Sequence, residues 1–287
     1  FDGALVAQID ARLDQIEREH VVRIPLAIES GSRAWGFPSP DSDYDCRFVY
    51  VRRAADYLTL FPKRDVIETP LTPVLDVSGW DVAKALKLML NGNAVIIEWL
   101  TSPIVYRANQ AFAQAFLDLA GVATDRNRLA HHYLRLGQSI VREKLGDLDD
   151  VALKKLFYAL RPAMALRWMR LHPAARIAPM NFQTLCAGAA LPSDLSRIVH
   201  DLLARKAVTR EMGRGPVPEI VRTTIFAEFE TAETHFTRAA PASPEDHARA
   251  DAFFREAKLV PLFPDACQTR FGLTAIVRKE QRHRELQ

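Results

Sequence analysis

The segment GSRAWGFPSPDSDYD at positions 31–45 constrains this chain of 287 residues more than any other. It follows VVRIPLAI, a short apolar run rich in β-branched residues that predicts a buried strand. After a loop rich in Gly, Ser and Pro, residues 43–51 alternate, with Asp43, Asp45 and Arg47 on one face and apolar residues on the other. We therefore expect a strand, a glycine turn, and a second strand that carries two acids on one face.

This arrangement is typical of a site for phosphate chemistry. Acids two positions apart on a strand point the same way and can converge on a hard cation such as Mg²⁺. Carboxylates of this kind hold the ions of two-metal sites, which stabilise the attacking and leaving oxygens of a nucleotidyl displacement. Gly31 allows a close approach of the backbone to phosphate, Ser32 adds a hydroxyl, and Arg33 can add charge. An isolated Asp-x-Asp is weak evidence, but Gly-Ser after one strand and Asp-x-Asp on the next is far stronger.

The string IESGSRAWGFPSPDSDYDCRFVYVR resembles the polymerase β-like nucleotidyltransferases, and especially the predicted nucleotidyltransferase group associated with RNA repair. The resemblance continues through DVSGWDVAKALKLMLNGNAVIIEWLTSPIVY and ALKKLFYALRPAMALRW, so it covers roughly residues 20–170. It implies a small nucleotidyltransferase domain followed by a helical domain, a nucleoside triphosphate (NTP) as donor, and Mg²⁺ or Mn²⁺. Cys46 departs from the aliphatic residue expected at its position, and it lies on the apolar face of the strand.

The resemblance also implies a third carboxylate on a later strand. Asp76 is the favoured residue, because an acid within the apolar run 74–77 is costly without a metal or a partner. Asp81 is the alternative, although the first turn of a helix favours an acid for purely structural reasons. The predicted catalytic and metal-binding set is therefore Asp43, Asp45 and Asp76, with Asp76 as the candidate base for the acceptor.

The predicted nucleotide-binding residues come from the turn and from a later helix, and are Gly31, Ser32, Arg33, Lys154 and Arg161. Lys154, Tyr158 and Arg161 share one helix face by their spacing. That face either reaches the triphosphate or is simply a solvated basic face.

Three residues near the turn allow two interpretations each. Glu29 either takes part in the site or is a solvated or salt-bridged acid at the end of a strand. Trp35 and Phe37 either stack on a base or anchor the loop to the core, and the anchor is favoured.

The pattern of the whole chain predicts an α+β protein with two domains. A small mixed sheet with flanking helices, of the nucleotidyltransferase type, is expected over residues 1–108, and an all-helical domain that closes over the nucleotide over 109–287. Pro162 predicts a kink or break in its helix. The other expected elements are strands at 65–68 and 74–77 and helices within 1–20, 78–92, 93–100, 109–120, 125–145, 150–171, 192–210 and 217–238, with one more beginning at Ser243.

Composition restricts the partners only weakly. A formal net charge of +3, from 38 basic and 35 acidic side chains, neither demands nor excludes a polyanion. No apolar run approaches the length of a membrane span. The cysteines at 46, 186 and 267 have no disulfide or metal-knuckle spacing, which favours the cytoplasm.

These patterns together predict metal-dependent transfer of a nucleoside monophosphate from an NTP to an acceptor hydroxyl, with release of pyrophosphate. The acceptor is an RNA end, as in RNA repair, or a protein hydroxyl or a small molecule. The alternatives are a protein-modifying AMP transferase with an antitoxin-like role, and a non-catalytic NTP-binding module. The oligomeric state is not indicated.

Overall fold

The computed structural model describes residues 2–145, 149–210, 212–236 and 241–259, so that Cys267 lies outside the described part. The strands are β1 (Val22–Glu29), β2 (Tyr44–Arg52), β3 (Val66–Glu68), β4 (Leu75–Asp81), β5 (Val105–Ala108), β6 (Val151–Ala152) and β7 (Arg214–Gly215). The helices are α1 (Gly3–His20), α2 (Gly31–Ala34), α3 (Val82–Leu90), α4 (Ala94–Leu100), α5 (Gln110–Ala123), α6 (Arg126–Ile140), α7 (Leu153–Leu171), α8 (Phe182–Gly188), α9 (Ser193–Val208), α10 (Glu219–His235) and α11 (Pro244–Leu259), with single turns η1 (Ala54–Tyr57) and η2 (Val141–Leu145).

A mixed five-stranded sheet carries the first part of the chain. Its strand order is β3-β4-β2-β1-β5, in which β2 and β4 run parallel and the other neighbours run antiparallel. This sheet with its helices, followed by a helical region, confirms the predicted α+β class. The parallel pair matters for the site, because both of its strands begin at the same edge of the sheet.

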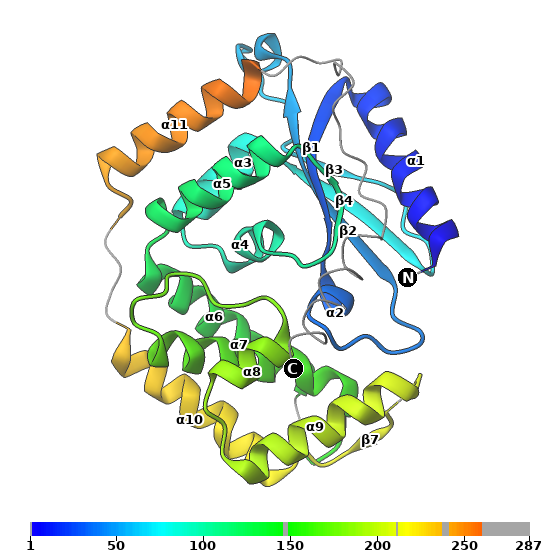
Figure 1. Ribbon diagram of the computed structural model, residues 1–287, viewed down its shortest axis with the longest axis vertical. Helices are drawn as coiled ribbons and strands as arrows, with labels where there is room; N and C mark the ends of the chain where they lie inside the picture. Colours follow the sequence, from blue (N-terminus) through cyan, green and yellow to red (C-terminus); the bar gives the residue numbers. More distant parts are fainter. Residues whose placement is uncertain (1, 146–148, 211, 237–240, 260–287) are drawn as a thin grey trace, which may run out of the picture.

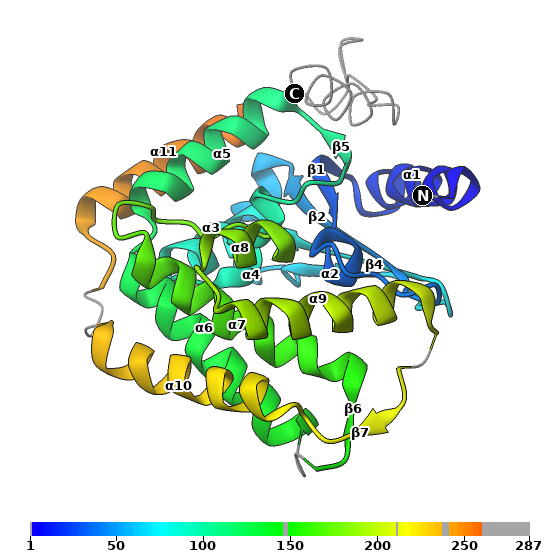
Figure 2. The ribbon, with the colours of Figure 1, turned by 60° about the horizontal axis from the view of Figure 1, so that its bottom comes forward.

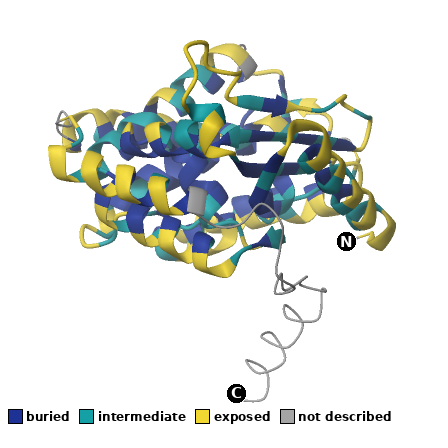
Figure 3. Cartoon of the chain, turned by 90° about the horizontal axis from the view of Figure 1, so that it is seen from above, coloured by how far each residue is buried: buried dark blue, intermediate teal, exposed yellow. Residues whose placement is uncertain are grey.

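Helices cover both faces of the sheet. On one face α1 packs its apolar stripe of Ile9, Leu13 and Ile16 against the apolar residues of β2 that alternate with Asp45 and Arg47. On the other face lie α3, α4 and α5, with α11 beside α3 and α5 (Figure 1). Figure 3 shows the buried residues concentrated in the strands and in the helix faces that meet. Asp45 on β2 therefore faces away from α1.

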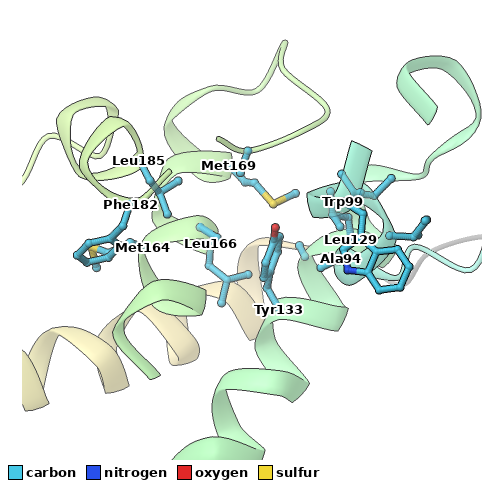
Figure 4. Close-up of a cluster of buried hydrophobic side chains, with 14 of the residues drawn as sticks. Ala94, Trp99, Leu129, Tyr133, Met164, Leu166, Met169, Phe182 and Leu185 are labelled. Atoms are coloured by element: carbon cyan, nitrogen blue, oxygen red, sulfur yellow. The ribbon is translucent and has the colours of Figure 1, made fainter. Parts of the chain in front are cut away.

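The helical region is built on α6, α7 and α10, which pack against one another, while α8 and α9 lie next to α2 (Figure 2). Its apolar core is continuous with the core under the sheet. Figure 4 shows Tyr133 of α6 among side chains from α4, α7 and α8, including Trp99 and Leu166. The break expected at Pro162 is not found, since α7 runs through this buried residue from Leu153 to Leu171.

Several elements differ from the prediction at their ends. Strand β4 continues to Asp81, so the following helix begins at Val82 and not at residue 78. Strand β5 and helix α8 were not expected. The expected start at Ser243 is confirmed: its hydroxyl accepts from the Asp246 N–H, and the Asp246 carboxylate accepts from the Ser243 N–H.

Helices α5 and α11, which the prediction assigned to the second domain, pack beside the sheet with α3. The division into 1–108 and 109–287 stays a prediction. Among the described residues, no helix is both long and apolar enough to cross a membrane.

Candidate active site

Two acids on neighbouring strands form the floor of the site. The parallel register of β2 and β4 sets Asp45 directly opposite Asp76, on strands about 4.8 Å apart. Both lie on the face turned away from α1, because Leu75 and Val77 on either side of Asp76 pack into the α1 core. The carboxylate-bearing side chains are 22% and 32% exposed. Sequence alternation and parallel pairing together bring this pair to one place.

Arg47 lies between the two acids. Its Nη2 donates to Asp45 Oδ1 at 3.0 Å and to Asp76 Oδ2 at 2.7 Å, and its Nη1 donates to the carbonyl oxygens of Cys46 and Asp76. Burial raises the pKa of Asp45, the charge of Arg47 lowers it, and the charges of Asp43 and Asp76 raise it again. The sequence placed Arg47 on the face of the two acids, but no role was predicted for it.

Asp43 lies just before β2 and is exposed. Within the described residues, no group of three or more His, Cys, Asp or Glu side chains is arranged to hold a metal ion. The expected set is thus only partly assembled, with Asp45 and Asp76 side by side and Arg47 between them. The donor set still fits a hard divalent cation, because it consists of carboxylates whose mutual repulsion a cation would relieve.

Gly31 lies directly against the carboxylate of Asp45. Its φ is +60°, and a Cβ at this position would lie 2.0 Å from Asp45 Oδ2, so no side chain fits without moving the carboxylate. The N–H of Ser30 donates to the carbonyl of Asp45 at 2.8 Å, which fixes the turn to β2. The glycine that the sequence suggested for phosphate approach is thus also required by the acid beside it.

The loop after the turn is held by side chains predicted to bind nucleotide. Ser32 Oγ donates to Ser42 Oγ at 3.0 Å. Arg33 donates to the carbonyl oxygens of Asp43 at 2.9 Å and Ser42 at 2.6 Å, and its guanidinium lies 4.0 Å from the centre of the Tyr44 ring. Both residues therefore shape the loop, and contact with phosphate stays a prediction for each.

A cavity of about 380 Å³ opens beside Asp43. One wall is the loop that carries Asp41 and Asp43, and the other consists of basic and aromatic residues on α7 and α9. This volume lies in the range of small-molecule sites. The lining residues are Ser32, Ser39, Asp41, Ser42, Asp43, Lys154, Lys155, Tyr158 and Lys206.

The family model described as RNA repair pathway DNA polymerase beta family matches residues 5–256. The chain belongs to this family. It is also similar to the protein YcgL of Bacillus subtilis (strain 168), which is described as uncharacterized, with 37% identity over 218 residues that cover 76% of this chain and 83% of YcgL. The resemblance drawn over roughly residues 20–170 is confirmed at the level of a polymerase β-like family associated with RNA repair.

In this member of the family, the basic wall includes a residue that the sequence analysis missed. Lys206 of α9 is 4% exposed and lines the cavity together with Lys154, which was predicted. Burial lowers the pKa of Lys206, the charge of Asp41 raises it, and that of Lys154 lowers it. No local signal marks Lys206 as a site residue, because only the packing of α9 against the loop brings it there.

Arg161, by contrast, does not line the cavity. It is 3% exposed, and it donates to Glu98 Oε1 at 2.6 Å and to the carbonyl of Met180 at 3.1 Å. Tyr133 donates to the same Glu98 oxygen at 3.0 Å. The face that Lys154, Tyr158 and Arg161 share is thus divided between the cavity and an interior ion pair, and the geometry favours a structural role for Arg161.

Trp35 and Phe37 lie as anchors of the loop. Trp35 Nε1 donates to Glu98 Oε2 at 3.1 Å, and its carbonyl accepts from the N–H of Phe182 at 2.8 Å. Phe37 stacks on Phe157 at 5.1 Å between ring centres and meets Phe182 edge-on. These contacts favour the anchor over base stacking for both residues.

Glu29 and Asp81 both have structural partners. Glu29 is fully buried, accepts from the Asp45 N–H at 3.1 Å and from the Tyr106 hydroxyl, and burial raises its pKa to about 7. Asp81 caps α3 through the Ala83 N–H at 2.8 Å. It lies at the far end of β4 from Asp76, so the geometry favours Asp76 as the third acid.

Proposed function

We propose that this chain transfers a nucleoside monophosphate from an NTP to a hydroxyl at an RNA end and releases pyrophosphate, with Mg²⁺ or Mn²⁺. The observation that carries the proposal is the parallel register that sets Asp45 beside Asp76, together with Asp43, two residues before Asp45, in a cavity whose opposite wall is basic. Membership in a polymerase β-like family associated with RNA repair supports both the reaction and the RNA acceptor.

The triphosphate would lie between the turn and the basic wall. Gly31 has no Cβ and a positive φ, which would let the backbone approach phosphate oxygens closely, and Ser32 lines the cavity and would add its hydroxyl. Lys154 and Lys206 from the opposite wall would neutralise the phosphates that leave as pyrophosphate. This arrangement would bring the α-phosphate towards Asp43, two residues before Asp45.

The acids would hold the metal and accept the proton. Asp43, Asp45 and Asp76 are the residues that would bind the divalent ion, which when bound supplies polarisation of the α-phosphate. The acceptor oxygen forms a bond to the α-phosphorus, and its proton passes to Asp76. The bond between the α-phosphorus and its bridging oxygen breaks, and the electron pair leaves with pyrophosphate.

The test is transfer of label from each of the four α-labelled NTPs to an RNA with a free 3′-hydroxyl, in Mg²⁺ and in Mn²⁺. Asp45→Asn should lower the rate by about a hundredfold or more, because it removes one of the metal-binding carboxylates. Asp118→Asn is the matched control, since Asp118 is an exposed acid on α5 whose carboxylate accepts from Gln114. Transfer unaffected by Asp45→Asn would reject the proposal.

The same assay separates the alternatives. Label that appears on a protein and not on RNA would replace the RNA acceptor by protein AMP transfer. NTP binding that depends on metal but leads to no transfer to RNA, protein or small molecules would identify a binding module. Each of these outcomes contradicts the proposal in a different step.

A further inference from the structure

Arg47 occupies the place that a cation shared by Asp45 and Asp76 requires. A single nitrogen of its guanidinium contacts both carboxylates, at 3.0 and 2.7 Å. The other terminal nitrogen donates to the carbonyls of Cys46 and Asp76, each at 3.2 Å. The side chain is only 18% exposed, so water screens these contacts less than it screens a surface pair.

We infer that Arg47 is a built-in competitor of the divalent cation: an ion that binds both Asp45 and Asp76 enters only when Arg47 releases them. The inference rests on the proposed function, since it concerns the same acids. Until the ion arrives, Arg47 holds together two carboxylates that the strand register forces side by side and that would otherwise repel each other.

The competition affects one part of the site and not the other. Arg47 makes no hydrogen bond or ion pair with Asp43 among the described contacts, and Asp43 lines the cavity beside Ser32. An ion held by Asp43 and by the phosphates of a nucleotide therefore does not meet the guanidinium. The two cation positions are unequal, and the one that includes Asp76 is the harder to fill.

The first experiment measures Mn²⁺ binding to the nucleotide-free protein by the EPR signal of free Mn²⁺. Arg47→Met should bind Mn²⁺ about tenfold more tightly than the wild type, because the ion no longer displaces a charge-assisted hydrogen-bonded partner. Adding Asp76→Asn to Arg47→Met should remove this gain.

Arg33→Met is the matched control. Arg33 also lowers the pKa of Asp45 by its charge, but its guanidinium donates to the Ser42 and Asp43 carbonyls and lies over the Tyr44 ring. Its removal should change the Mn²⁺ affinity much less. An equal gain in Mn²⁺ affinity in both variants would mean that only the loss of a nearby positive charge matters, and it would overturn the inference. Weaker Mn²⁺ binding in Arg47→Met would overturn it as well.

A second measurement needs only the wild-type protein. ¹⁵N spectra of the arginine guanidinium groups should show the Arg47 signals, assigned with Arg47→Lys, move as Mg²⁺ is added without nucleotide. Signals that stay in place while Mg²⁺ saturates the protein would overturn the inference. A transfer activity that Asp45→Asn abolishes would leave the proposed function intact in that case, so the two can fail separately.

Discussion

Two arginine–carboxylate clusters in this chain use the same chemistry in opposite surroundings. Arg161 and Glu98 are 3% and 8% exposed and lie at a joint between α4, α6 and α7. Arg47 and its two acids are 18–32% exposed. In the sealed cluster nothing can replace a lost partner, whereas in the open one water or a metal ion can. Burial therefore separates a structural ion pair from an exchangeable one.

Breaking the sealed cluster should have the largest effect. Arg161→Met leaves the buried Glu98 charge without its cation and should lower the free energy of unfolding by about 3–5 kcal/mol. Urea denaturation measures this loss. Arg197→Met is the control, because its ion pair with Asp194 is exposed and should contribute less than about 1 kcal/mol. Equal losses in the two variants would show that burial does not distinguish the clusters.

The second largest effect is expected from a methyl group added at Gly31, next to Asp45 of the exposed cluster. Gly31→Ala forces a Cβ onto Asp45 at a positive φ, and should lower the free energy of unfolding by about 1–3 kcal/mol and reduce nucleotidyl transfer. Thermal denaturation and the transfer assay check both effects. Gly121→Ala on α5, where nothing lies within 4 Å of the new Cβ, should instead leave stability equal or higher. A Gly31→Ala protein with normal stability and activity would mean that the acid moves aside at no cost.

Lys206 is the intermediate case, since it is as buried as the sealed pair but lies in the wall of the cavity. Lys206→Met should change the free energy of unfolding by less than about 1 kcal/mol, because it removes an ammonium group that burial disfavours. The KM for NTP should rise about tenfold through the loss of a phosphate contact, with kcat less affected. Lys84→Met, on α3 and paired with Asp65, is the control. An unchanged KM would remove Lys206 from the nucleotide site.

The sequence predicted those parts of the site that depend on neighbours along the chain. Alternation after residue 43 correctly placed Asp45 on the face of β2 turned away from the apolar core against α1. Alternation along one strand could not predict the contact between Arg47 and Asp76, because that contact depends on the parallel pairing of two strands about 30 residues apart. Strand β5 and helix α8 leave a weak signal because few of their residues are buried: only Ala108 in β5, and Phe182 and Leu185 in α8.

Helical periodicity does not show how deep Arg161 lies in the protein, for a geometric reason. Lys154, Tyr158 and Arg161 do share a face, but seven residues of helix advance by about 10 Å. That distance carries Arg161 past the cavity and into the core at Glu98. Lys206 could not be predicted, since its position depends on how α9 packs against the loop of residues 38–42. Periodicity predicts which face of a helix a residue lies on. Which part of the protein that residue meets along the length of the helix depends on tertiary packing.

The Glu98 joint has a consequence for how a ligand is received. Its carboxylate accepts from Arg161 of α7, from Tyr133 of α6 and from Trp35 of the loop next to the acids. Glu98 therefore links the loop that forms one wall of the cavity to the helix α7 that contributes to the other wall. A nucleotide that binds here finds its surroundings already ordered, so little conformational entropy is lost in assembling them, and more of the contact energy remains as affinity.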